Sequence, residues 1–386
     1  MTDASSPSVA RVALTALTLT DFRNYAHLAL KLDGRSVVLV GANGSGKTNL
    51  LEAVSFLSPG RGLRRAPYDT VARSGGSGGW TVHAELETAS GPVAIGTGIA
   101  PDAGGPRSRR IRIDGEDASS SDALLSHLDV VWLTPAMDGL FTGPAGDRRR
   151  FLDRLVMGLD PAHGRNATRY EKAVRHRNRL LEDPGADAGW FDAIETEIAQ
   201  HGAAIAAARA DLVARFRNAI DAIPPDASAF PRAHLALDGD FEARTDGADA
   251  QERAETFRRL LSEGRPRDRA AGRTLTGPHR ADLVVTHADK AMPAAQASTG
   301  EQKALLIGLI LAHAELIADA NRRAPVLLLD EVAAHLDPNR RAALYDRLER
   351  LGGQIFMTGT DPILFEAIGE RAEIFHVADG RLAPGA

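Results

Sequence analysis

One segment of the chain has the residue types and spacing of a phosphate-binding loop. Residues 41–48 fit the pattern G-x-x-x-x-G-K-[ST] at every position. Glycines let the backbone wrap closely around phosphate oxygens, so that several N–H groups point inward. An apolar run precedes the segment and a predicted helix follows it, which disfavours the alternative of a chance glycine-rich loop. The predicted ATP-binding residues are Gly41, Ala42, Asn43, Gly44, Ser45, Gly46, Lys47 and Thr48.

Two of these residues have predicted chemical roles. Lys47 is expected to reach the β- and γ-phosphates and to act in catalysis, and the Thr48 hydroxyl to bind Mg²⁺. Far along the chain, Asp330 and Glu331 follow the apolar run 326–329. We predict that Asp330 binds Mg²⁺, directly or through water, and that Glu331 is the general base. Acidic residues often follow strands, so the functional interpretation of this pair depends on the presence of the phosphate-binding loop.

A second candidate cradle for phosphate lies at residues 298–301, before a predicted helix. Ser298, Thr299, Gly300 and Glu301 resemble the S-G-G-[QE] signature of ABC-type ATPases. In that family the signature binds the ATP held by the opposite subunit, so the resemblance implies an ATP-dependent homodimer. A helix N-cap is another interpretation of the same residues, and both interpretations can hold.

Two further features of that superfamily follow. Asp337 lies seven residues after Asp330, which is the spacing of the D-loop. A strand ending in a switch histidine usually comes next, but the predicted strand at 354–360 contains no histidine. Thr358 or Thr360 is the candidate for that role, and we expect hydrolysis to be slow.

The elements that must position these groups divide the chain into three parts. Strands are predicted at 12–19, 37–40, 80–113, 130–133 and 326–329. Helices are predicted at 48–57, 147–159, 165–181, 191–220 and 304–317. We therefore predict an α/β fold with a P-loop ATPase core built from both ends of the chain, 1–146 and 271–386. A mainly helical lobe, 147–270, is inserted between them.

Composition limits the classes of function. The 386 residues are 44% hydrophobic and 25% charged, with a net charge of −5, as in an ordinary globular protein. Because the sequence has no cysteine, disulfides, thiolate nucleophiles and zinc–thiolate sites are excluded. Residues 1–10 lack the basic and apolar blocks of a signal peptide, and no stretch approaches about 18 apolar residues. These features predict a cytoplasmic protein without a membrane segment.

Several motifs resemble the RecF family of ABC/SMC-type ATPases. About 250 residues separate Thr48 from Ser298, more than in transporter ATPases and fewer than in SMC proteins with their coiled-coil arm. The family-like segments are 21–25 (DFRNY), 41–52 (GANGSGKTNLLE), 148–153 (RRRFLD), 177–181 (RNRLL) and 276–283 (TGPHRADL). The resemblance implies an ABC-type ATPase head that binds DNA in an ATP-dependent way, with weak DNA-stimulated ATP hydrolysis. It further implies recombinational repair, replication-fork maintenance, the SOS response and partners of the RecO/RecR type.

Charge spacing gives a candidate DNA surface on the helix 165–181. Long polar side chains recur at spacings of 4, 3, 4 and 3, at Arg165, Arg169, Lys172, His176 and Arg179. Such spacing places them on one face, flanked by Arg175 and Arg177, with Tyr170 as the only aromatic residue nearby. We predict that five cations bind the backbone of single-stranded, gapped or junction DNA: Arg165, Arg169, Lys172, Arg175 and Arg179.

Alternatives remain at this stage. The basic helix face is also explained as an ordinary solvated surface, and a second cluster, Arg107, Arg109, Arg110 and Arg112, is expected on an exposed strand and loop. An ABC-type ATPase subunit that drives a membrane or other protein partner is the competing function, and a small-molecule kinase is a third. His279 and Arg280 have no derivable role and are interpreted as structural.

Overall fold

The computed structural model describes residues 9–101, 108–224 and 228–385 and divides into two compact units. The first unit combines the two ends of the chain, Met1–Asp138 and Leu306–Ala386. The second unit is Gly139–Leu305. The predicted lobe, 147–270, falls inside the second unit, and the division of the chain at 146/147 and 270/271 stays a prediction.

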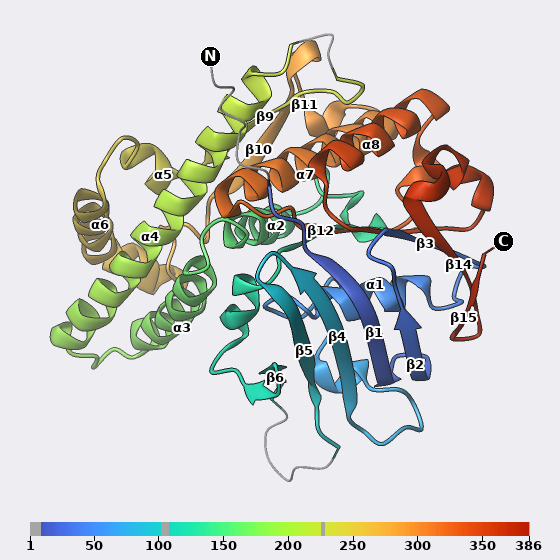
Figure 1. Cartoon of the computed structure of the whole chain (residues 1–386). Helices are drawn as coiled ribbons and strands as arrows, with labels where there is room; N and C mark the ends of the chain where they lie inside the picture. Colours follow the sequence, from blue (N-terminus) through green and yellow to red (C-terminus); the bar gives the residue numbers. More distant parts are fainter. Residues whose placement is uncertain (1–8, 102–107, 225–227, 386) are drawn as a thin grey trace, which may run out of the picture. The chain divides into compact units, whose positions relative to one another are not determined.

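The first unit contains a six-stranded sheet of order β15-β14-β3-β13-β12-β8, of which β3, β12, β14 and β15 are labelled in Figure 1. Its strands are β3 (Ser36–Val40), β8 (Val130–Leu133), β12 (Val326–Leu329), β13 (Ile355–Gly359), β14 (Ala372–Ala378) and β15 (Arg381–Pro384). All neighbours are parallel except β14 and β15. Buried parallel strands have near-continuous apolar sequences, which is why the runs 37–40 and 326–329 were recognisable. Their carboxyl ends meet at one edge of the sheet.

A second sheet of the first unit is antiparallel, with the order β2-β1-β4-β5-β6-β7. Its strands are β1 (Ala13–Phe22), β2 (Tyr25–Lys31), β4 (Trp80–Thr88), β5 (Gly91–Ile99), β6 (Arg110–Ile113) and β7 (Glu116–Asp117). The helix α1 (Lys47–Ser55) shares one hydrophobic core with both sheets. Within it, Phe22, Phe56 and Trp80 contact one another at centroid distances of 4.9–6.0 Å.

The second unit is mainly helical, with a three-stranded sheet of order β11-β10-β9. Its helices are α2 (Ala145–Met157), α3 (His163–Glu182), α4 (Ala188–Asp221), α5 (Asp240–Arg244) and α6 (Ala250–Ala271). Its strands are β9 (Ala233–Asp238), β10 (Asp282–His287) and β11 (Met292–Pro293). The core of this unit joins α3, α4 and α6 around Phe241 and Phe257, which stack at 4.3 Å. Helix α6, which accommodates Pro266 in its interior, is not among the helices predicted from the sequence.

The remaining elements lie toward the C-terminus or in short turns. Helix α7 (Thr299–Asn321) begins in the second unit and ends in the first, and α8 is Pro338–Leu351. Short 3₁₀ segments are η1 (Tyr68–Val71), η2 (Ser121–Ser126), η3 (Pro135–Met137), η4 (Ala288–Lys290), η5 (Ala294–Gln296), η6 (Ala333–His335) and η7 (Pro362–Arg371).

Helix α7 corrects one expectation about hydropathy. Within the described residues it is the one helix that is long and apolar enough to cross a membrane by length and composition. Its apolar window is 67% buried, as in a core helix, and buried apolar residues occur on every face of the helix. The expectation that no stretch approaches this length was therefore wrong, while the burial gives little support to a membrane role.

Candidate nucleotide-binding site

The loop between β3 and α1 has the form of a phosphate cradle. Gly46 adopts φ +116°, and a Cβ there would lie 2.6 Å from Asn24 Nδ2, so that only glycine fits. Tyr25 Oη donates to the Gly46 carbonyl at 3.0 Å and Asn24 Nδ2 to the Ser45 carbonyl at 3.2 Å. These contacts fix the loop carbonyls from the side of the β1–β2 turn. The DFRNY segment therefore braces the loop.

A buried hydroxyl of the loop is available to bind a phosphate. Ser45 Oγ is buried and has no hydrogen-bond partner among the described residues. Buried hydroxyls are normally paired, so an orphan in a cradle indicates that its partner is a ligand. The same loop precedes the N-terminus of α1, where backbone N–H groups and the helix dipole favour anions.

Lys47 lies folded over the loop. Its Nζ donates to the carbonyls of Gly41 at 2.6 Å and Ala42 at 2.9 Å, and the residue is only 5% exposed. Burial lowers the pKa of the Lys47 amine, and the nearby Glu331 and Asp330 partly oppose this effect. No carboxylate among the described residues is bonded to this cation, which lies beside the cradle, where a phosphate would supply its counter-charge.

Thr48, Asp330, Glu331 and Thr358 come together at the carboxyl edge of the parallel sheet. Thr48 Oγ1 donates to the Asp330 carboxylate at 2.9 and 3.0 Å, and Thr358 Oγ1 donates to Asp330 Oδ1 at 2.7 Å. The Glu331 N–H donates to Thr358 Oγ1 at 2.9 Å. Thr358 therefore connects the carboxylate to the backbone of the next residue. Thr360 is exposed and makes no such printed contact in the described structure.

The Glu331 backbone is strained. Its φ is +54°, in the left-handed region that non-glycine residues rarely adopt. Such conformations cost about 1–3 kcal/mol and often occur at functional sites. The Thr358 hydroxyl contributes to holding this conformation, since it accepts from the Glu331 N–H.

The oxygen set of Thr48 and Asp330 fits a hard divalent cation. Both side chains present oxygen ligands, which Mg²⁺ prefers, and Mg²⁺ is commonly bound by one or two protein oxygens together with substrate phosphates. Among the described residues there is no group of three or more histidines or acids that would hold a metal by itself. A cation here would therefore depend on nucleotide oxygens for its remaining ligands.

Sequence reasoning missed an ionic network behind the loop. The Glu52 side chain is fully buried on α1, where Arg23 binds it through two nitrogens at 2.6 and 2.8 Å and Arg64 at 2.6 Å. Arg64 also donates to Asn49, which donates to Asn24. The signal was an acidic residue among the apolar positions of a helix, because a buried carboxylate needs a cationic partner.

The signature residues lie in the second unit, at the start of α7. Ser298 Oγ and N–H both donate to Glu301 Oε2, at 2.8 and 2.9 Å, which is a capping-box contact. Lys290 pairs with Glu301 and lowers its pKa to about 2, with Ser298 adding to the shift. Ser298, Thr299 and Gly300 are exposed, so the capping interpretation holds and leaves their outer surface free for a ligand.

Asp337 is the N-cap of α8. Its carboxylate accepts from the N–H groups of Asn339 and Arg340 at 3.0 Å, and these contacts lower its pKa, the Arg340 N–H most of all. The side chain is exposed. Asp337, the predicted D-loop residue, thus orders the start of a helix.

The basic face of α3, defined here as Arg165, Arg169, Lys172, Arg175 and Arg179, is exposed at all five positions. The flanking Arg177 was wrongly placed beside this face. Its side chain is fully buried and pairs with Glu195 at 3.0 Å and Asp268 at 2.7 Å. Tyr170 is also buried, so it offers no ring for base stacking.

The second arginine cluster does not form one surface. Arg109 is held by the Thr97 hydroxyl and by the carbonyls of Phe56, Ser58 and Gly60. Arg112 pairs with Asp117 at 2.8 Å, Arg110 is exposed, and Arg107 lies outside the described residues.

His279 has a structural position within the second unit. Its Nδ1 lies 2.6 Å from Tyr170 Oη and its Nε2 lies 3.0 Å from the Thr274 carbonyl, so Nε2 carries the proton and Nδ1 accepts. Burial lowers its pKa to about 4. Arg280 is exposed.

Comparisons with known proteins fit this geometry. Residues 13–382 match the family described as RecF/RecN/SMC N terminal domain. The chain is 57% identical to the DNA replication and repair protein RecF of Mesorhizobium japonicum, covering 97% of this chain and 98% of that protein. The chain belongs to the RecF family. The Brucella suis RecF is 56% identical over 96% of each chain, and the Rhizobium meliloti RecF 55% identical over 97% of this chain and 99% of its own.

Solved structures confirm the predicted fold class. The structure titled recombination mediator protein RecF-ATPrS in RecFOR pathway superposes with a TM-score of 0.84 at 22% identity, covering 99% of this chain and 100% of that chain. An Smc head domain bound to the C-terminal domain of ScpA, from Pyrococcus furiosus, gives 0.53 at 15% identity, covering 97% of this chain and 96% of its own. This RecF-family chain therefore has the α/β head fold of RecF and SMC proteins.

Proposed function

We propose that this RecF-family chain is an ATP-binding protein of DNA replication and recombinational repair, including the SOS response. Its relatives at 53–57% identity, which it covers almost completely, carry the name DNA replication and repair protein RecF. Solved relatives are titled as RecF with ATP or ATPrS, which favours ATP as the nucleotide of the loop at 41–48. The competing function, an ATPase subunit that drives a membrane partner, has no support from these relatives.

The observation that carries the proposal is the contact between Thr48 and Asp330. Two residues 282 positions apart in the sequence share a hydrogen bond at 2.9 Å beside the cradle. Bound Mg²⁺ would neutralise phosphate charge, and Thr48 and Asp330 would hold it there. Lys47 would turn from the loop carbonyls to the β- and γ-phosphates. Glu331, anchored by Thr358, would accept a proton from the attacking water.

We propose further that ATP joins two copies of the chain. The exposed Ser298, Thr299 and Gly300 at the start of α7 offer a hydroxyl and helix N–H groups to a phosphate. In the family this surface completes the site of the opposite subunit, so two chains would meet head to tail with ATP between them. Slow hydrolysis at Glu331 would then separate them.

The basic face of α3 is the proposed DNA contact. Its five cations are exposed and without a nearby exposed aromatic residue of α3, so binding through phosphates is favoured over stacking. RecO/RecR-type proteins are proposed partners on the family relationship, since RecF structures are described within the RecFOR pathway. The proposed location is the cytoplasm.

The test is DNA binding with no nucleotide, with ADP and with ATP, across single-stranded, duplex and gapped DNA. The proposal predicts that ATP raises the affinity for at least one form, while ADP does not. Equal binding in all three nucleotide conditions would contradict ATP-dependent DNA binding.

A further inference from the structure

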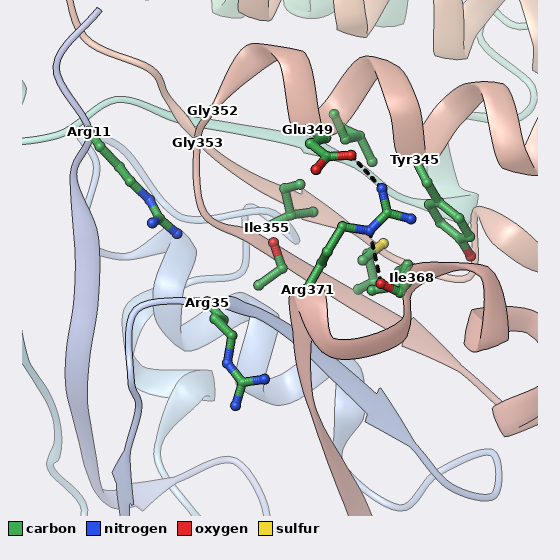
Figure 2. A pocket seen from close by; sticks show the side chains of 12 residues that line it. Arg11, Arg35, Tyr345, Glu349, Gly352, Gly353, Ile355, Ile368 and Arg371 are labelled. Carbon is green, nitrogen blue, oxygen red and sulfur yellow. Dashed lines mark hydrogen bonds and ion pairs between the residues drawn. The ribbon is translucent and has the colours of Figure 1, made fainter.

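A pocket of about 290 Å³ lies in the first unit, away from the nucleotide-binding loop (Figure 2). Ser36 and Ile355, which line it, are the first residues of the parallel strands β3 and β13. The phosphate loop and Thr358 lie at the other ends of these strands. The pocket is therefore at the amino edge of the sheet, whereas the nucleotide site is at the carboxyl edge.

The floor of the pocket is apolar. It is formed by buried side chains of α8, β13 and η7: Tyr345, Leu348, Ile355, Met357 and Ile368. The Tyr345 hydroxyl already donates to the Leu364 carbonyl at 2.8 Å, so the ring presents carbon to the pocket. An apolar floor of this kind gains free energy when an apolar group covers it.

Two glycines keep one wall free of side chains. A Cβ at Gly352 would meet no atom within 4 Å, which shows that space is open there. At Gly353 a Cβ would lie 2.3 Å from the carbonyl oxygen of Pro325, the residue before β12. The two backbone segments are therefore so close that no larger residue fits at position 353. The Gly352–Gly353 turn thus leaves room for an incoming group.

The rim of the pocket is cationic and consists of Arg11, Arg35 and Arg371 (Figure 2). Two of these arginines are already neutralised, Arg35 by Asp33 at 2.7 Å and Arg371 by Glu349. Arg11 is exposed and donates to the Gly34 carbonyl at 2.6 Å. In the described part of the chain Arg11 has no carboxylate within ion-pair distance. Among the described residues that line the pocket, Glu349 is the one acidic residue.

We propose that this pocket binds an acidic peptide segment of a partner protein, with a bulky apolar side chain on the floor and a neighbouring carboxylate paired with Arg11. The volume is at the lower limit of the roughly 300–1,000 Å³ of small-molecule sites, which suits one side chain better than a cofactor. A small carboxylic acid would leave the floor uncovered, and a DNA backbone would place charged phosphates rather than a bulky apolar group against it. The proposal goes beyond the binding of ATP and DNA.

The test uses a defined probe with the full chain. A capped, fluorescein-labelled hexapeptide Ser-Glu-Asp-Phe-Glu-Ser is titrated by anisotropy with the protein up to about 1 mM, where binding of about −4 kcal/mol is measurable. One control peptide carries Gln and Asn in place of the acids, and another carries Ser in place of Phe. We expect both controls to bind at least about tenfold more weakly.

Variants of the pocket should change the affinity in opposite directions. Arg11→Glu should weaken binding at least about tenfold and Arg11→Lys should largely restore it, because the carboxylate loses and regains its partner. Glu349→Gln removes the one negative charge of the lining and should tighten binding several-fold. Lys31→Glu, an exposed charge reversal on β2 outside the pocket, is the matched control and should bind as wild type.

The outcomes separate this proposal from the nucleotide site. ATP affinity should be equal in wild type, Arg11→Glu and Glu349→Gln, since none of these positions touches the loop at 41–48. Equal peptide affinity in Arg11→Glu and Lys31→Glu would overturn the proposal. Binding of the Ser-for-Phe peptide as tight as the parent, with full competition by succinate, would also overturn it and indicate a small-carboxylate site.

Discussion

Replacing Thr358 by valine tests how the end of β13 supports the acidic pair at 330 and 331. Valine has nearly the same shape as threonine, with a methyl group in place of the hydroxyl. The side chain is 1% exposed, donates to Asp330 at 2.7 Å and accepts from the Glu331 N–H at 2.9 Å. A hydrogen bond to a charged group contributes about 1.5–3 kcal/mol, and an unsatisfied buried donor costs about 1–3 kcal/mol. Because the two hydrogen bonds share one hydroxyl, their contributions do not add fully, and we expect a total loss of about 2–4 kcal/mol.

The loss should be visible in both stability and hydrolysis. For a unit of this size about 1 kcal/mol lowers the melting temperature by about 2–4 °C, so Thr358→Val should melt about 5–15 °C lower. Hydrolysis should fall at least about tenfold, because the strained Glu331 backbone loses an anchor, while ATP still binds. Thr358→Ser keeps the hydroxyl and is the control, with near wild-type values. Melting within about 1 °C of wild type and unchanged hydrolysis in Thr358→Val would refute this reasoning.

Three further experiments test the phosphate-binding loop, the basic face of α3 and His279. Lys47→Ala should weaken ATP binding at least about tenfold. The melting temperature should change by only about 2–4 °C, since the Lys47 Nζ contacts only loop carbonyls. Wild-type ATP affinity in a calorimetric titration would contradict the assignment of residues 41–48 as the ATP-binding loop. Reversal of Arg169, Lys172 and Arg179 to Glu should weaken DNA binding at all sequences alike and flatten the log–log salt dependence by about 0.9 per lost duplex phosphate contact; an unchanged slope would place the DNA surface elsewhere. Burial lowers the pKa of His279 to about 4, so between about pH 6.5 and 4 the unfolded chain binds a proton that the folded chain does not. The free energy of unfolding should therefore decrease as the pH falls through this window, by up to about 3 kcal/mol. If urea unfolding of His279→Gln shows the same pH dependence, this histidine is not its cause.

The nucleotide site was predictable because its signals are local. The loop at 41–48 is contiguous, and the apolar runs 37–40 and 326–329 identify the two strands that carry Thr48 and Asp330 to one edge. The parallel register then brings these residues together, which sequence spacing alone does not show. The position of the Lys47 side chain was not predictable from the sequence, because its contacts with the carbonyls of Gly41 and Ala42 depend on how the loop folds.

Contacts that depend on tertiary packing were less predictable. Arg177 lies among the buried positions of α3, where Tyr170, Val174 and Leu181 repeat at helical spacing, and its partners Glu195 and Asp268 come from other helices. The 3.6-residue period therefore contained the signal that Arg177 faces inward, but its charge suggested the surface. Helix α6 was missed because Pro266 indicates a break, whereas packing of its Phe257 and Leu261 stabilises it.

We propose that ATP, bound between the loop at 41–48 of one chain and Ser298 of another, controls assembly. The most direct measurement is the mass in solution of the Glu331→Gln variant with no nucleotide, ADP or ATP, alongside Ser298→Arg in the same background. Gln keeps the shape of Glu331 but cannot accept a proton, so the ATP-bound state should accumulate. The account predicts a dimer with ATP only, and none with Ser298→Arg although it still binds ATP. A chain that stays monomeric with ATP well above tens of micromolar, or a dimer equally strong without nucleotide, would contradict it.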